Sequence, residues 1–287
     1  MSRPSARAWE RKRKLANGLL WGGAILATIV ALVPLALLLS YVAIQGVPHL
    51  SWSFFTQLPK PVGEPGGGMA HAVIGSLLLI GLAGLVGLPV GILGGIYLAE
   101  FGNNRFGGSV RFAADVLSGV PSIVIGIFVY TWVVIPMHRF SALAGGLALG
   151  ILMIPIVMRT TEEMFRLVPT SLREAALALG ATPSRTIIGV VLPAARGGVI
   201  TGVLLAVARV AGETAPLLMT ALGFNFLSAR LDQPIAALPL QIFVYAISPY
   251  EQWHAQAWAA AVVLVALVTI LSLAARYFTR GQLRTVR

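Results

Sequence analysis

Residues 71–99 read HAVIGSLLLIGLAGLVGLPVGILGGIYLA, and this stretch decides the class of the fold. It contains no Asp, Glu, Lys or Arg over 29 residues. A helix of about 20 apolar residues spans the hydrocarbon core of a bilayer, because each residue adds about 1.5 Å. The stretch therefore predicts a transmembrane helix.

Five further apolar runs contain few charges, and all but one have about this length, so we expect an all-α membrane protein with six transmembrane helices. The predicted spans are residues 18–45, 71–99, 112–135, 143–158, 198–224 and 256–276. The fourth is short and has Pro155 near its close, which indicates either a helix shielded by its neighbours or a misplaced end. The composition agrees, since 57% of the residues are apolar and only 11% are charged.

The net charge of +11 is explained by membrane topology. Lys and Arg number six in residues 1–17, two in 100–111, five in 159–196 and four from Arg276 onward, against three (Lys60, Arg139 and Arg230) in the alternate loops. Because cytoplasmic loops carry the excess of basic residues, this asymmetry of seventeen to three places both termini in the cytoplasm. No nucleic-acid partner is needed to explain the charge.

One membrane domain is the simplest division of the chain. We expect a basic cytoplasmic tail (1–17), a first transmembrane helix (18–45), an external loop (46–70), a core (71–277) with a cytoplasmic loop at 159–196, and a cytoplasmic C-terminal tail (278–287). The first apolar run could be a secretory signal, but it is long and lacks a convincing cleavage site, so we interpret it as a retained helix. The external loop is expected to begin with a short helix or interfacial turn.

The residues that are missing exclude several chemistries. There is no Cys, and none of the three Lys follows a glycine, so the chain has no phosphate-binding loop of an ATPase. The four His do not have metal-ligand spacing. We therefore predict no catalytic residue, no cofactor and no metal site in this chain, and expect that it is not an enzyme.

The cytoplasmic loop contains the signals of a helical elbow. Residues 171–179 are rich in Ala and Leu, and Gly180 can adopt the left-handed conformation that follows a helix end. Thr182 then suits an N-cap and Pro183 the first helical position. The sequence predicts two short helices at an angle, on the inner side of the membrane.

These residues resemble the cytoplasmic loop of ABC importer permeases. Glu174, Ala175 and Ala176 are followed by Gly180 four positions later, and Leu192 and Pro193 lie twelve and thirteen positions after that glycine. In that family the elbow is the coupling helix that docks on a separate ATPase subunit, so the resemblance implies this role for Glu174, Ala175, Ala176, Gly180, Leu192 and Pro193. Val190 stands where the family prefers Ile, which is a conservative departure.

A charged pair lies within the fifth predicted span. Arg209 is about twelve residues into it, hence roughly 18 Å deep, and Glu213 follows four residues later on the same face of a helix. The pair could be a self-satisfied structural ion pair, or Arg209 could face the substrate pathway and bind an oxyanion with its planar guanidinium. Asp115, near the inner end of the third span, is expected to be a cap or an interfacial anchor.

A second resemblance favours the pathway. Residues 211–217 (AGETAPL) and 118–126 (SGVPSIVIG) are similar to segments of phosphate-specific ABC permeases. Residues 54–56, 66–68 and 96–101 resemble the PstA type rather than its PstC partner. The resemblance implies a type I ABC importer permease fold in a bacterial inner membrane and inward transport of inorganic phosphate by alternating access, with Arg209, Glu213 and Thr214 on the substrate pathway.

The same resemblance implies a complex: a second permease of the PstC type, two ATP-binding subunits that hold ATP and Mg²⁺ on the cytoplasmic side, and an external phosphate-binding protein. Two alternatives stay open. One is a permease for another oxyanion, sulfate or molybdate, because an arginine alone does not distinguish tetrahedral anions. The other is an ion-coupled secondary carrier in which Arg209 and Glu213, together with Asp115, relay protons without ATP.

Overall fold

A computed structural model describes residues 6–61, 63–64, 66–228 and 230–280 of the chain. Their regular structure is helical, with one isolated bridge between Leu222 and Ile235. The elements in chain order are α1 (Ala6–Gly46), η1 (Val47–His49), α2 (Trp52–Thr56), α3 (Ala70–Glu100), α4 (Arg105–Gly119), α5 (Ser122–Val129), η2 (Tyr130–Val134), α6 (Ile135–Met137), α7 (Ala142–Arg166), α8 (Thr170–Ala178), α9 (Pro183–Thr186), η3 (Ile187–Val191), α10 (Leu192–Ala211), α11 (Ala215–Thr220), α12 (Leu238–Ala246) and α13 (Glu251–Arg280).

Six membrane spans are confirmed when one of them is counted as a bent pair. Five are long apolar helices: Arg13–His49, Ala70–Glu100, Ala142–Arg166, Pro183–Ala211 and Glu251–Ala274. The sixth consists of Arg105–Gly119 and Ser122–Met137, which meet at 103°. The tails predicted at 1–17 and 278–287 are helical where they are described, and residues 1–5 and 281–287 lie outside the described part.

The third span was wrongly predicted as one helix over 112–135. α4 ends at Gly119, Val120 is extended (φ −71°, ψ 131°), and α5 starts only after Pro121. Proline disfavours helical geometry in the residue before it, and it has no N–H to continue the helical ladder. The chain therefore turns sharply where a straight span was expected.

The fourth span was predicted too short, because α7 continues past Met158 to Arg166. The helix passes through Pro155 and carries the charged residues Arg159, Glu162 and Arg166 in its last turns. Glu162 forms ion pairs with both arginines at 2.9 and 2.8 Å. These partners satisfy the charges, so the helix does not end where the apolar run ends.

The fifth span and the loop 159–196 also need correction. The chain is helical from Pro183 through η3 to Ala211, so the second helix of the elbow is the start of a long span rather than a short helix. At the other end the predicted helix 198–224 is interrupted at Gly212, Glu213 and Thr214, and α11 is a separate short helix. Of the predicted loop, only 167–169 and 179–182 are non-helical.

Small residues bring α3 and α7 into close contact. A methyl group placed on Gly91 would lie 2.7 Å from Cβ of Val157, and one on Gly87 would lie 2.9 Å from the carbonyl oxygen of Gly150. No side chain larger than hydrogen fits at these positions, so the glycines of the second span form a packing surface. The main core joins these two helices to α10, α11 and α12; it contains Leu79, Leu149, Met153, Val157, Val210, Leu217 and Leu240.

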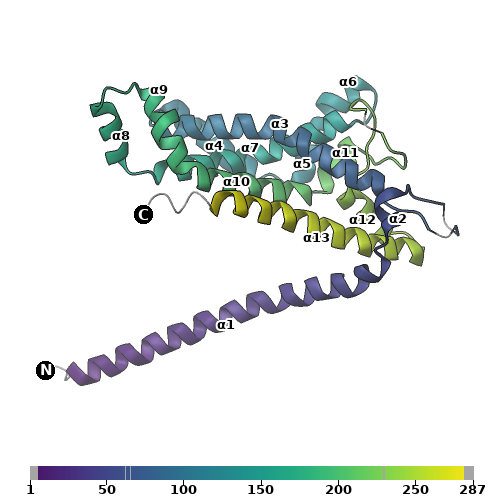
Figure 1. The fold of residues 1–287 in the computed structure, drawn as a ribbon, viewed down its shortest axis with the longest axis horizontal. Helices are drawn as coiled ribbons and strands as arrows, with labels where there is room; N and C mark the ends of the chain where they lie inside the picture. Colours follow the sequence, from purple (N-terminus) through teal and green to yellow (C-terminus); the bar gives the residue numbers. More distant parts are fainter. Residues whose placement is uncertain (1–5, 62, 65, 229, 281–287) are drawn as a thin grey trace.

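The long helices run along an elongated body, and several short helices lie at its two ends (Figure 1). α8 and α9 lie at one end, hereafter the elbow end, together with the first described turns of α1 and the last of α13. η1 and α2, which confirm the short helices expected after residue 46, lie at the opposite end with α12. α1 diverges from the body and contacts it only near its C-terminus, where Tyr41 meets Trp258 at 5.4 Å between ring centroids.

Candidate functional site

A cavity of about 250 Å³ lies where the two broken helices face each other. One wall is the bend between α4 and α5, and another is the last turn of α10 with the residues that follow it. α7 supplies the third. The lining residues are Leu117, Ser118, Gly119, Val120, Pro121, Ser122, Leu152, Ile156, Arg209, Val210 and Glu213.

Close packing of α5 on α11 brings these segments together. A methyl group on Gly126 would lie 2.7 Å from Cα of Pro216, so only glycine allows the two backbones to approach this closely. Gly126 and Pro216 belong to the two sequence segments singled out above, 118–126 and 211–217. Segments almost a hundred residues apart therefore form one site.

Arg209 and Glu213 both line the cavity, but they do not form the ion pair that their spacing suggests. α10 ends two residues after Arg209, and the Glu213 amide donates to the carbonyl of Val210 in a tight turn. Glu213 therefore leaves the helix face that Arg209 occupies. None of the ion pairs found among residues 6–61, 63–64, 66–228 and 230–280 includes either side chain.

Thr214 lies beside the cavity rather than in its lining. Its hydroxyl donates a hydrogen bond of 3.5 Å to the carbonyl of Pro239, at the start of α12. Of the three residues predicted on the pathway, Arg209 and Glu213 thus line the cavity. Thr214 instead connects the break between α10 and α11 to α12.

The cavity offers the chemistry of a weak anion site. Arg209 is exposed and Glu213 is half-buried, so one cation and one carboxylate face the same space. Ser122 starts α5 at the cavity wall, where the helix N-terminus contributes partial positive charge. A guanidinium binds an oxyanion with two parallel N–H donors, and the nearby carboxylate limits how tightly the anion is held.

The predicted elbow is present: α8 and α9 form it at the elbow end of the molecule. Gly180 has φ +82°, the left-handed conformation expected after a helix, and the Thr182 hydroxyl accepts a hydrogen bond of 3.4 Å from the Arg185 amide. Ala176 is buried, whereas Glu174 and Ala175 are exposed. Leu177 and Leu179 expose 47% and 89% of their surface, so apolar side chains are exposed at the C-terminal end of α8.

Leu192 and Pro193 lie apart from that face. Leu192 packs against the cluster of Phe165, Val168, Val191, Ala195 and Val199, and Pro193 follows the π-helical turn η3. The wider turn accommodates a residue that has no N–H to donate. These two residues belong to the start of α10, which follows the elbow, and not to its exposed surface.

Residues 91–284 match the model of a protein family described as "Binding-protein-dependent transport system inner membrane component". The chain belongs to this family. Its relatives include the phosphate transport system permease proteins PstA of Haemophilus influenzae (46% identity; 93% of this chain and 94% of the relative) and of Yersinia pestis (45%; 96% and 92%). PstA 1 of Mycobacterium tuberculosis is 38% identical over 92% of this chain and 88% of its own length.

Solved structures place the permease in a known fold. The MetNI methionine ABC transporter in an inward-facing conformation matches 75% of this chain and 97% of its own with a TM-score of 0.60 at 21% identity. A bacterial ABC transporter involved in the import of alginate matches 96% and 99% with a TM-score of 0.57 at 14% identity. At these identities the likeness shows the fold alone, that of a type I ABC importer permease.

The sequence did not reveal an ion cluster between α4 and the last turns of α7. Glu162 is buried, with 2% of its side chain exposed, and accepts from Arg111 at 2.6 Å as well as from Arg159 and Arg166. Asp115, predicted as a cap or interfacial anchor, lies within α4 and pairs with Arg159 at 3.2 Å. Arg159, Glu162 and Arg166 have helical i,i+3 and i,i+4 spacing, which is the sequence signal that could have indicated the cluster.

A second ion pair missed from the sequence ties the elbow to the membrane helices. Arg173 of α8 contacts Glu100, the last residue of α3, at 2.8 Å. The two residues are 73 positions apart in the chain, and no local pattern joins them.

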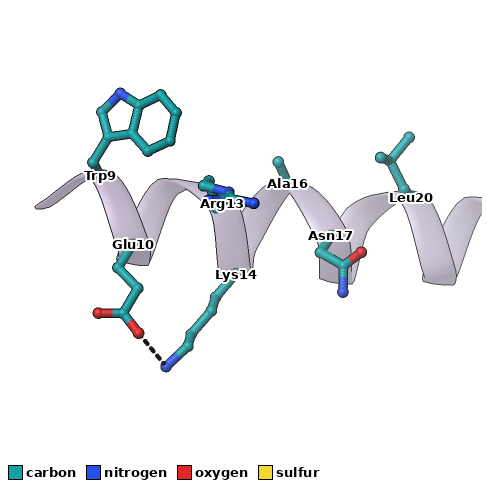
Figure 2. Close-up of a pocket in the computed structure, with 7 residues that line it drawn as sticks. All are labelled: Trp9, Glu10, Arg13, Lys14, Ala16, Asn17 and Leu20. Carbon is teal, nitrogen blue, oxygen red and sulfur yellow. Dashed lines mark ion pairs between the residues drawn. The ribbon is translucent and has the colours of Figure 1, made fainter. Parts of the chain in front are cut away.

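The permease has another hollow along α1, but it is not a site. Figure 2 shows that its seven lining residues, Trp9, Glu10, Arg13, Lys14, Ala16, Asn17 and Leu20, all project from one helix with nothing facing them. Glu10 and Lys14 form an i,i+4 ion pair at 3.3 Å, and the Arg13 guanidinium lies 5.4 Å from the Trp9 ring centroid. An aromatic residue among basic ones is typical of the end of a transmembrane helix at the membrane surface.

Proposed function

We propose that this chain is the membrane-spanning subunit of an ATP-driven importer that moves inorganic phosphate into the cell. The observation that carries the proposal is the cavity in which Arg209 meets the bend at residues 118–122. The printed names of the relatives, phosphate transport system permease proteins at 38–46% identity, support phosphate as the transported anion. Arg209, Glu213 and Thr214 are the pathway residues in this proposal.

The cavity geometry supports a transient site for the anion. Phosphate would contact the Arg209 guanidinium and the Ser122 hydroxyl, and repulsion by the Glu213 carboxylate would favour its release. A hydrogen bond to a charged group contributes about 1.5–3 kcal/mol, which suits a site that must also release its ligand. Selectivity among oxyanions would then come largely from the external binding protein.

The elbow end would face the cytoplasm and receive the motion of the ATPase. In this proposal α8 docks on an ATP-binding subunit through Glu174, Ala175 and its exposed leucines, and Gly180 sets the angle to α9. Since α9, η3 and α10 are continuous, a displacement of the elbow would reach Arg209 along one helix. The cavity could thereby open to each side of the membrane in turn.

Permeases of this family work in complexes with ATPase and binding-protein partners. The finer assignment is a heterodimer with a second permease of the PstC type, two ATP-binding subunits at the elbow end, and a phosphate-binding protein at the opposite end. ATP and Mg²⁺ would be held by the ATPase subunits, so this chain supplies the path and no catalysis. The lack of neighbours along most of α1 is compatible with a second permease beside it.

The experiment that tests the function is uptake of radiolabelled phosphate into vesicles that carry this subunit with its partners. Uptake that requires ATP and is unaffected by excess sulfate supports the proposal. Competition by sulfate or molybdate would assign the chain to another oxyanion. Uptake that continues with an inactive ATPase subunit but stops when the proton gradient is removed would instead identify a secondary carrier.

A further inference from the structure

The Arg173 side chain uses both ends of its donor fork to join three parts of the molecule. Its Nε and Nη2 atoms donate to the Glu100 carboxylate, the shortest contact being 2.8 Å. Its Nη1 donates to the carbonyl of Val168 at 2.6 Å, and its Nη2 to the carbonyl of Phe165 at 2.8 Å. The side chains of Arg173 and Glu100 are only 20% and 12% exposed, so water screens this ion pair weakly.

These contacts fasten the elbow to two membrane helices at their ends. Glu100 is the last residue of α3, Phe165 lies in the last turn of α7, and Val168 follows that helix. The carbonyls of Phe165 and Val168 are acceptors at the end of α7, and that of Phe165 also accepts from the Val168 amide. An arginine satisfies them because its five donors lie in one plane at fixed angles. A lysine would offer three donors from a single point and could not reach the carboxylate and both carbonyls together.

The two fastened helices are closely packed. α3 and α7 contact each other through Gly87, Gly91 and Gly95, where an added methyl group would lie within 2.9 Å of atoms of α7. α7 also lines the cavity through Leu152 and Ile156. A displacement of α8 that reaches the ends of α3 and α7 is therefore carried along α7 to the cavity wall opposite Arg209.

We propose that Arg173 and Glu100 form a coupling clamp, which transmits the movement of α8 to the paired helices α3 and α7. The inference rests on the proposed function, because it assigns a route for the ATPase movement. It adds a second route to the continuous chain from α9 to α10. With both routes intact, two walls of the cavity move together when α8 moves; without the clamp, the α10 wall moves alone.

The test compares variants in the complete transporter reconstituted in liposomes, with phosphate uptake and ATP hydrolysis measured on the same samples. Arg173→Gln and Glu100→Gln should lower the phosphate transported per ATP hydrolysed at least about tenfold, while ATP hydrolysis stays within about twofold of the parent. Glu100→Gln leaves the two carbonyl contacts of Arg173 in place and so keeps the elbow folded. Arg173→Lys should fall between the parent and Arg173→Gln.

Matched controls separate coupling from a general effect of charge. Arg105→Gln and Glu163→Gln make the same changes at exposed positions near the same end of the molecule and should leave the transport ratio unchanged. Copurification of the ATPase subunit and the thermal unfolding temperature should be similar in all variants. If Arg173→Gln lowers association or stability while the transport ratio stays normal, Arg173 only supports the fold, and the clamp is refuted.

A rescue experiment tests the mechanical role directly, because the chain contains no Cys. Glu100→Cys combined with Arg173→Cys, in partners also freed of cysteine, should be uncoupled when reduced. A short bis-methanethiosulfonate linker between the two thiols should restore the transport ratio. Failure of the linked protein to recover, with the parent transporting normally, would overturn the clamp; a parent that shows no ATP-dependent phosphate uptake would instead overturn the proposed function.

Discussion

Arg209 is the central residue of the proposed substrate pathway. It lies at the cavity without an ion-pair partner among the described residues, so the interpretation as a self-satisfied structural pair with Glu213 loses its geometric basis. A cation placed in a membrane span is costly, and it is retained where it serves a function. Its free donors are therefore available to an anion.

Replacing Arg209 should affect transport and leave the fold intact. In Arg209→Gln, phosphate uptake should fall about 10- to 100-fold, the equivalent of about 1.5–3 kcal/mol for a charged hydrogen bond. Arg209→Lys should retain part of the uptake, since it keeps the charge but loses the planar fork. Assembly with the partners, followed by copurification, should be unchanged; normal uptake by Arg209→Gln would remove this residue from the pathway.

Glu162 joins α4 to the last turns of α7. It is buried and accepts from three arginines, and the residues of this cluster carry three positive charges against two negative ones when Asp115 is included. Removing one partner of a buried ion pair costs about 3–5 kcal/mol, because the remaining charges are left uncompensated.

The arginine side chains are 22–55% exposed and so partly solvated, and Glu162→Gln should therefore destabilise the purified permease by about 1–3 kcal/mol, measured by unfolding in detergent. Glu163→Gln, an exposed change one residue away, is the control and should be close to neutral. Equal stability of the two variants would mean that the cluster does not hold α4 against α7.

At the scale of elements, the angle between α8 and α9 is set by Gly180. Its φ of +82° is accessible to glycine without strain, and no other atom would touch an added Cβ there. Any effect of substitution is thus a backbone effect. A β-branched residue in the left-handed conformation costs about 1–2 kcal/mol, whereas asparagine tolerates it better.

We expect Gly180→Val to weaken the association of the ATPase subunit and to reduce uptake, and Gly180→Asn to do so much less. A bulky residue at Glu174, on the exposed face of α8, should also weaken association while membrane insertion survives. Copurification of the ATPase subunit measures both effects. Normal association in Gly180→Val and in the Glu174 variant would contradict the docking role of the elbow.

At the scale of the whole molecule, the arrangement of charge predicts the orientation in the membrane. The elbow end carries α8 and α9, which belong to one of the segments rich in Arg, and the opposite end carries α2, the helix that precedes Glu64 in the chain. Cytoplasmic loops hold the excess of basic residues, so the elbow end should face the cytoplasm.

Single cysteines in the cysteine-free chain test this orientation. Glu64→Cys should react with a membrane-impermeant maleimide in cells whose outer membrane is opened but whose inner membrane is intact. Asn103→Cys, exposed between α3 and α4, should react only after the inner membrane is permeabilised. The reverse labelling pattern would invert the topology and place the proposed ATPase surface outside.

The sequence by itself determined the features that depend on neighbouring residues. Apolar runs of sufficient length gave the membrane spans, because bilayer thickness fixes how long a helix must be. Gly180, Thr182 and Pro183 predicted the end of one helix and the start of the next, since capping is a local interaction. The family resemblance singled out the two segments that form the cavity.

Only the tertiary structure decided the features that depend on contacts between residues far apart in the chain. α7 runs past the end of its apolar stretch because Glu162 and its arginines satisfy one another across helices, and the third span bends so that residues 118–122 can face α10. Arg209 and Glu213, four residues apart, were expected on one helix face, but the helix ends between them. The Arg173–Glu100 contact joins residues 73 positions apart. Such contacts depend on which helices pack together, and local patterns in a single sequence do not indicate which helices are neighbours.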